Sequence, residues 1–136
     1  MVHGMFVLGS DDDNEKTIWE TLRFAIKQKI DTIQMMILTP LPGTKVHNEL
    51  VSQKRIFTRD WNLYDGQHIV FNPKLLTAEE LQRTVFKAYK KFYSLSRSFS
   101  LLCRLRFRNA MFTAMGHHIV KKFLTRNNQL NWLKGN

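Results

Sequence analysis

Residues 33–44 read IQMMILTPLPGT, and this stretch decides the fold. A mostly apolar run leads into a Thr-Pro-x-Pro-Gly-Thr sequence, which is typical of a buried parallel strand that ends at a functional edge. Pro40 favours an extended conformation at Thr39, Pro42 fixes the next φ angle, and Gly43 permits a turn that a side chain would obstruct. The sequence predicts a strand with a shaped exit.

Thr44 follows this exit and can cap a short helix that carries Val46 and Leu50. Turn residues mark loops in every fold, so an ordinary strand-to-helix connection is the commoner explanation of this chemistry. Spacing alone does not identify a site here.

The amino-terminal end supplies a matching first strand, GMFVLG at residues 4–9, which we interpret as buried. Ile18, Leu22, Ala25 and Ile26 then form an apolar stripe on a helix expected over about 14–28, with Asn14 or Asp13 as its cap. Together with residues 33–38 this predicts one right-handed β-α-β unit.

The carboxyl ends of two such parallel strands lie side by side, so residues 9–13 and 39–43 are expected to share one rim. Two parallel strands also leave both outer edges unpaired. The unit therefore needs neighbours from elsewhere in the chain or from another chain. A start in mid-core is a first indication that preceding sequence is missing.

Residues 52–76 are interpreted as an irregular, aromatic-anchored segment with one short strand at 68–71. Thr77 and Glu80 form a capping box that opens a helix extending to about residue 95. After an interruption at 94–100 we expect a helix from 101 to 115 and another over 117–126. Trp132 and Leu133 are expected to dock the tail.

Charged residues are distributed unevenly along the 136-residue chain. Residues 1–68 hold 8 Lys and Arg against 9 Asp and Glu, whereas residues 69–136 hold 13 against 2. Basic helices with interleaved aromatics can bind nucleic acid or an anionic membrane surface. No known nucleic-acid-binding motif accompanies them, so we expect no specific nucleic-acid binding, while peripheral membrane contact stays open.

Metal and nucleophile chemistry finds little support in the sequence. Cys103 is the only cysteine, which excludes an internal disulfide and a thiolate-held cluster and fits a cytoplasmic setting. His117 and His118 are adjacent and cannot chelate one metal from a helix. We find neither catalytic nor metal-ligating residues, and no stretch long enough for a signal-peptide core or a membrane span.

Three stretches carry a family resemblance: GMFVLGSDDD at residues 4–13, ILTPLPGT at 37–44, and RDW with YDG at 59–61 and 64–66. They resemble the later part of radical SAM enzymes, in particular the subgroup with an N-terminal cobalamin-binding domain. The resemblance covers most of the chain and is strongest over residues 3–71. It implies an α/β fold, the last β-α-β part of a partial (β/α)6 barrel, followed by a mainly helical basic C-terminal region.

In that family the barrel holds a 4Fe-4S cluster and S-adenosylmethionine (SAM). The first stretch resembles the fifth strand and the second the sixth, which implies SAM-binding roles at Gly4, Phe6, Gly9, Leu38, Thr39 and Pro40. After Gly9, where many members have Pro-Gly-Glu-Thr, this chain has DDDN at residues 11–14, an acidic variant familiar in the cobalamin-linked subgroup. The Cys-x3-Cys-x2-Cys cluster loop is absent, and Cys103 cannot replace it.

The resemblance therefore implies a C-terminal portion of a radical SAM enzyme, inactive alone and without a cofactor of its own. Its expected parts are a barrel segment at 1–52, an aromatic connection at 53–76 and a basic helical region at 77–136. Expected partners are the missing N-terminal barrel half or cobalamin-binding domain, and self-association through open strand edges. A split-enzyme subunit that completes a partner's barrel, and a basic module that binds nucleic acid or anionic membrane, are the alternatives.

Overall fold

The structure is a computed structural model that describes residues 1–126. The expected docking of Trp132 and Leu133, and the end of the 77–136 region, lie outside the described residues. The elements in chain order are β1 (His3–Leu8), α1 (Glu15–Lys27), β2 (Thr32–Ile37), α2 (Lys45–Ser52), a 3-10 turn (Trp61–Leu63), α3 (Ala78–Phe92), α4 (Leu95–Cys103) and α5 (Phe107–Arg126).

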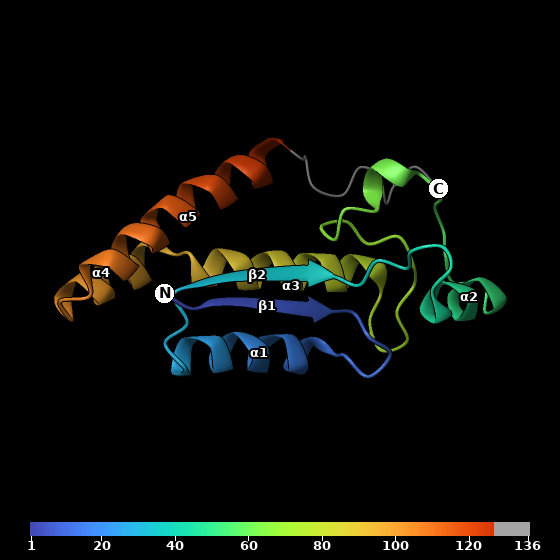
Figure 1. Cartoon of the computed structure of the whole chain (residues 1–136), viewed down its shortest axis with the longest axis horizontal. Helices are drawn as coiled ribbons and strands as arrows, with labels where there is room; N and C mark the ends of the chain where they lie inside the picture. The colour runs from blue at the N-terminus through green and yellow to red at the C-terminus, as the bar shows by residue number, and fades with distance from the viewer. Residues whose placement is uncertain (127–136) are drawn as a thin grey trace.

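The first three elements form the predicted β-α-β unit. β1 and β2 pair in parallel, with His3 opposite Thr32 and Leu8 opposite Ile37, as the two arrows of Figure 1 show. Asn14 caps α1 with a capping box, because its side chain accepts from Thr17 N while the Thr17 hydroxyl accepts from Asn14 N. The predicted strand, helix, strand order and the parallel pairing are confirmed.

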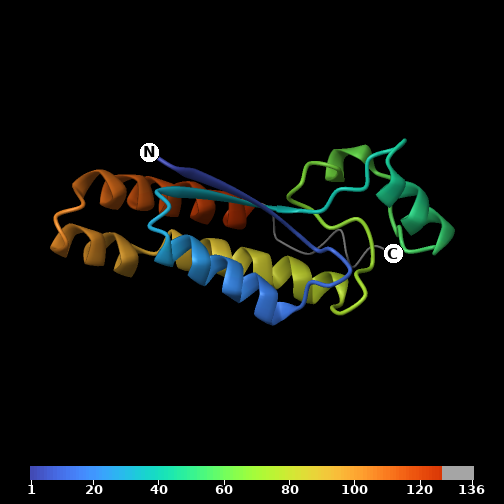
Figure 2. The same cartoon turned by 60° about the horizontal axis from the view of Figure 1, so that its bottom comes forward.

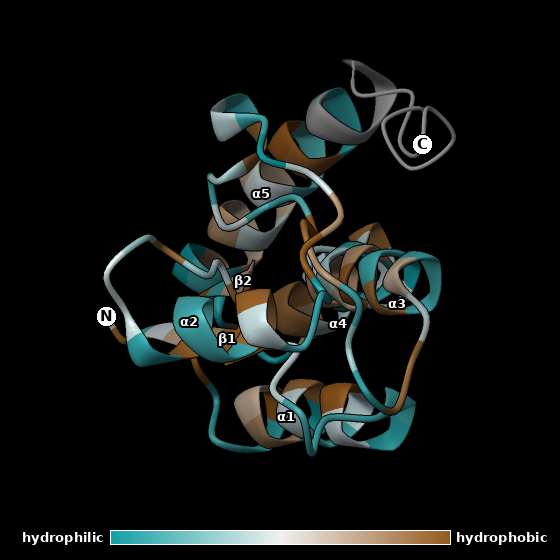
Figure 3. Ribbon diagram, turned by 90° about the vertical axis from the view of Figure 1, so that its right-hand side faces the viewer, coloured by the Kyte–Doolittle hydropathy of each residue, from teal (hydrophilic) through white to brown (hydrophobic). Residues whose placement is uncertain are grey.

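Two helices cover one face of this small sheet. α1 and α3 pack against each other beside the strands, and Figure 3 shows apolar segments of the helices turned toward the centre of the molecule. The core side chains alternate along β2 and recur at helical spacing on α1 and α3, as expected for faces that meet. They include Leu8, Ile18, Leu22, Ile33, Met35, Ile37, Leu81, Val85 and Phe92.

The connection from α2 to α3 is irregular, as predicted, but the short strand expected at 68–71 is reduced to one antiparallel bridge between Ile56 and Phe71. Its main chain is already used elsewhere, since Ile69 N donates to the Gln82 side chain at 2.8 Å. The side chains of residues 69–71 are nevertheless almost fully buried, so this segment fills the core without extending the sheet.

The carboxyl-terminal helices differ from the prediction. Residues 94–100 are not an interruption, because the Ser94 side chain accepts from Arg97 N and begins α4. The break falls at Leu105, which has a φ of 55°. α5 is one continuous helix from Phe107 to Arg126 that passes through Gly116, where two helices had been expected. Within residues 1–126, no helix combines the length and apolar character needed to cross a membrane.

Candidate functional site

The carboxyl ends of β1 and β2 meet at one rim, as the parallel pairing requires. Leu38 N donates to Leu8 O at 2.8 Å, so the strands stay paired up to the point where both chains turn away. Figure 2 shows the chain leaving both strands at the end opposite α4. This rim is the candidate site, because functional groups of parallel sheets gather beyond the carboxyl ends of the strands.

Gly9 turns the chain at the end of β1. Its φ is 99°, and an added Cβ would lie 2.8 Å from Cδ2 of Leu81 on α3. The Asp13 carboxylate accepts from Gly9 N at 2.8 Å and from Ser10 N at 2.9 Å. A side chain of the loop itself therefore stabilises the turn. The N–H groups of Gly9 and Ser10 already have an acceptor.

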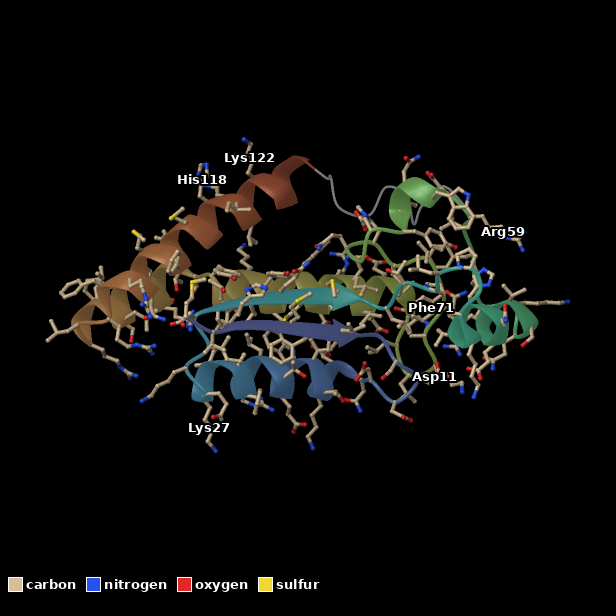
Figure 4. All side chains as sticks on the ribbon, in the orientation of Figure 1. Asp11, Lys27, Arg59, Phe71, His118 and Lys122 are labelled. Carbon is tan, nitrogen blue, oxygen red and sulfur yellow. The ribbon has the colours of Figure 1, made fainter. Side chains whose placement is uncertain are left out.

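Asp11 fastens the same loop to the segments that follow α2. Its carboxylate accepts from the Arg55 guanidinium at 2.6 and 3.1 Å and lies 2.7 Å from Lys74 Nζ. The hydrogen bond from Arg55 lowers the pKa of Asp11 to about 2, and Lys74 adds to the effect. Figure 4 marks Asp11 at this end of the molecule. The acidic loop thus forms an ion-pair network across the rim.

The exit of β2 is shaped as its prolines and glycine predict. The Thr39 hydroxyl donates to Ile37 O at 3.1 Å, Pro40 is almost fully buried, and Gly43 turns with a φ of 85°. Thr44 caps α2 by accepting from His47 N, which confirms the predicted helix start. Thr39 and Pro40 lie in the wall of the rim.

Gly4 and Phe6 lie further down β1 than the other four expected SAM-binding residues. The Phe6 ring packs edge-on against Phe24 of α1, with ring centroids 6.5 Å apart. A Cβ added at Gly4 would meet this ring and the Ile30 side chain. The structure therefore places Gly9, Leu38, Thr39 and Pro40 together at the rim, and Gly4 and Phe6 on the face that α1 covers.

The opposite face of the sheet was missed by sequence reasoning. Met5 and Val7 are 61% and 56% exposed, whereas both faces of β1 had been interpreted as buried. Their register neighbours on β2 are Gln34 and Met36, which are half-buried. The open face of the sheet consists of four residues: Met5, Val7, Gln34 and Met36. The apolar residues 5–8 of β1 predict covering on both faces, but the described chain covers only one.

The two outer edges of the sheet also differ from each other. Tyr93 Oη lies 2.9 Å from Ile33 N and 2.8 Å from Ile33 O, and Tyr89 Oη accepts from Met35 N at 2.8 Å. Ile37 N donates to Gly66 O at 2.7 Å. The expectation that the strand edges need neighbours from elsewhere in the chain or from another chain is confirmed for β2, because Tyr89, Tyr93 and the loop that precedes α3 supply its partners.

The outer edge of β1 has no such cover. Thr32 N and Leu38 N donate to Val2 O and Leu8 O, so the alternation of a parallel ladder turns the main chain of Met5 and Val7 away from β2. No hydrogen bond within the described part of the chain reaches these outward groups. The sheet is open on one edge and on one face.

The described part of the chain holds no set of side chains suited to bind a metal ion or an iron-sulfur cluster. No group of three His, Cys, Asp or Glu side chains there could hold a metal ion. Cys103 is exposed at the end of α4, away from the rim, and a 4Fe-4S cluster needs several thiolates. His117 Nδ1 lies 2.9 Å from Tyr93 O, which gives this ring a structural partner. The chain therefore does not fit the cluster by itself.

Curated proteins with related sequences are methyltransferases and a cyclase. The bacteriochlorophyllide d C-12(1)-methyltransferase of Chlorobaculum tepidum is 36% identical over 92 residues, which are 68% of this chain and 20% of that protein. An uncharacterized methyltransferase of Pyrococcus horikoshii is 32% identical over 66% of this chain and 20% of its own length. The anaerobic magnesium-protoporphyrin IX monomethyl ester cyclase of Cereibacter sphaeroides is 33% identical over 65% of this chain and 14% of its own length.

No protein-family model matches the chain. The chain spans about one fifth of the length of the first curated relatives that it matches. Its α/β fold with a two-stranded parallel sheet is consistent with a part of a radical SAM fold. The matches support the radical SAM resemblance and show a chain homologous to a fraction of these larger methyltransferases and cyclase.

Proposed function

We propose that this chain is the C-terminal part of a radical SAM enzyme, in which β1 and β2 are neighbouring strands of a partial (β/α)6 barrel. SAM and a 4Fe-4S cluster belong to the parent enzyme, which we assign to the subgroup with an N-terminal cobalamin-binding domain. Three of the related proteins are methyltransferases by name, so methyl transfer is the reaction class that we propose for the parent.

The asymmetry of the sheet carries this proposal. β2 is closed by Tyr89 and Tyr93, as the last strand of an open barrel must be, whereas β1 presents a free edge and exposed Met5 and Val7. A preceding strand would pair with β1, and the open face would then line the barrel interior. The terminal helices cover the outside.

This assignment gives the chain a structural role at the SAM site and no radical chemistry of its own. Gly9, Leu38, Thr39 and Pro40 form the part of the wall that lies at the rim. Thiolates for the cluster come from a second segment that carries Cys-x3-Cys-x2-Cys. If that segment is a separate polypeptide, the chain is a split-enzyme subunit, and this is the second candidate.

The first experiment is to identify and co-express that segment. Translation of the source DNA upstream of codon 1 in all frames is expected to reveal a Cys-x3-Cys-x2-Cys frame. Co-expressed with this chain, its product is expected to elute with it in size-exclusion chromatography. Unrelated upstream sequence and no complex would contradict the proposal and favour a free-standing basic module.

A single substitution tests the mode of assembly. Val7 N–H points to the free edge, so Val7→Pro removes the outward donor without touching the ladder to β2, and proline is tolerated on edge strands. We expect Val7→Pro to keep the fold of the isolated chain and to lose the complex. Val7→Thr, which keeps the donor, is the matched control and should retain it. Equal binding by both variants would exclude strand addition at β1.

A further inference from the structure

A groove of about 720 Å³ lies at the end of the molecule opposite the rim. It is bounded by the end of α1, the end of α3 and the whole of α4, which gather beside the amino-terminal ends of the strands in Figure 1. Six cationic residues line it: Lys27, Lys29, Lys91, Arg97, Arg104 and Arg106. No acidic residue does.

Most of these charges have no acidic partner within residues 1–126. Arg106 lies 3.8 Å from the buried carboxylate of Asp31, the one contact with an acid that any of the six makes within residues 1–126. Lys27, Lys29 and Lys91 form no ion pair in that range. Six like charges around one concavity repel one another, and a bound anion would relieve the repulsion.

Arg97 is held in place by partners other than an acid. Its guanidinium lies 3.8 Å from the Phe92 ring centroid and donates to Phe92 O and to the Thr113 hydroxyl, each at 3.2 Å. Burial lowers the pKa of Arg97 and the charge of Arg106 adds to this effect, whereas Tyr93 and Asp31 oppose it. The side chain is therefore a preorganised positive charge at the wall of the groove.

We propose that this groove binds an oligophosphate, that is, a ligand with two or more linked phosphate groups. Arginine forks and lysine ammonium groups are the side chains that bind phosphate oxygens, and three groove-lining serines add hydroxyl donors. A compact group with several charges can contact cations from three helices at once. The site is independent of the rim and of the proposed barrel role.

The shape of α4 argues against a flat membrane as the occupant. Arg97, Ser100 and Arg104 face the groove, whereas the exposed Leu95 and Phe99 follow a different side of the helix. A planar surface cannot contact both sides together. Free oligophosphates and the diphosphate headgroups of polyprenyl lipids share the same chemistry, so the test separates these two sources.

The test is calorimetric titration of the full chain with sodium pyrophosphate, compared with sodium sulfate at equal ionic strength. Pyrophosphate is expected to bind and sulfate to bind at least about tenfold more weakly, because a single divalent group reaches fewer of the cations. The groove variant Lys27→Gln/Arg104→Gln is expected to lose affinity by about tenfold or more.

The matched control Lys54→Gln/Lys122→Gln removes the same charge elsewhere. Figure 4 shows Lys27 below α1 and Lys122 on the far side of α5. Equal loss in both variants, or no binding of pyrophosphate at millimolar concentration, would overturn the proposal. Stronger binding to duplex DNA than to pyrophosphate, unaffected by the groove variant, would do the same.

A measurement on the unmodified chain covers the case in which the groove variant does not fold. Pyrophosphate should protect Lys27, Lys29 and Lys91 from acetylation and leave Lys54 and Lys122 reactive. Uniform protection or none contradicts the site. Vesicles that contain a polyprenyl diphosphate test the lipid source: protection of the same lysines by these vesicles and not by pyrophosphate would assign a headgroup, and protection by pyrophosphate assigns a soluble ligand.

Discussion

Tyr93 Oη contacts both main-chain groups of Ile33, accepting from N at 2.9 Å and donating to O at 2.8 Å. One hydroxyl therefore takes the place that the next strand of a sheet would fill. Burial raises the pKa of Tyr93, and it raises that of Tyr89 to about 12, so both remain protonated at neutral pH. Tyr89 of α3 and Tyr93, the residue that caps the end of this helix, together end the sheet at β2.

Removal of this hydroxyl should be costly. Tyr93→Phe leaves a buried N–H and a buried carbonyl without partners, and we expect it to lower the free energy of unfolding by about 2 to 4 kcal/mol. Tyr89→Phe frees a single N–H at Met35 and is expected to cost about 1 to 2 kcal/mol. Urea denaturation followed by circular dichroism measures both.

The order of the two effects is the informative part. If Tyr89→Phe were as destabilising as Tyr93→Phe, the number of hydrogen bonds to β2 would not explain the closure of this edge. Unchanged midpoints in both variants would mean that water replaces the hydroxyls.

Gly9 and Gly43 both have positive φ angles, but their surroundings differ. A Cβ at Gly9 would lie 2.8 Å from the Leu81 side chain, whereas a Cβ at Gly43 would meet nothing within 4 Å. Gly9→Ala is expected to destabilise by about 2 to 4 kcal/mol through backbone strain and overpacking. Gly43→Ala should cost about 1 kcal/mol through strain alone. Similar melting temperatures for the two variants would show that Leu81 can move aside.

Local signals in the sequence predicted much of the fold. Thr77 accepts from Glu80 N at 3.1 Å, and Glu80 accepts from Thr77 N at 2.8 Å, which is the capping box expected at this helix start. The apolar stripe of α1 and the Thr44 cap were likewise visible, since caps and periodicity depend on residues a few positions apart. Gly9, Thr39 and Pro40 lie at the rim predicted from residues 9–13 and 39–43, and Leu38 directly precedes it; their SAM-binding role stays a prediction.

Contacts between residues far apart in the sequence, such as those that cover the β2 edge, were not predictable in this way. Tyr93 and Ile33 are 60 positions apart, and the spacing of tyrosines on a helix says nothing about which strand edge they reach. The continuity of α5 was missed because glycine disfavours a helix interior, while here close packing against Tyr93 requires it. Met5 and Val7 look like core residues because they are apolar, yet the described residues leave both side chains exposed.

Asp11 gives the rim a pH dependence. Its folded pKa of about 2 lies below the ordinary 3.8, so the stabilisation is complete above the unfolded value and is lost as the pH falls from about 4 to about 2. The carboxylate is 40% exposed, so solvent screening limits the effect to about 1 kcal/mol or less. Asp11→Asn should melt lower than the native chain at pH 5 and converge with it near pH 2. A variant at the exposed neighbour, Asp12→Asn, should run parallel to the native chain throughout, and convergence there too would remove the assignment to Asp11.

Gly116 decides how closely α5 approaches α3. A Cβ at this position would overlap the Tyr93 ring, which cannot retreat because its hydroxyl is bound to Ile33 and its carbonyl faces His117. Helix propensity favours Gly116→Ala by about 1 kcal/mol, whereas overpacking opposes it by about 1 to 3 kcal/mol. We expect packing to win, so that Gly116→Ala lowers the melting temperature although alanine is the better helix former. The converse change at an exposed neighbour, Ala114→Gly, should cost about 1 kcal/mol by propensity alone. A higher melting temperature for Gly116→Ala would mean that α5 can shift without loosening Tyr93 from the strand edge.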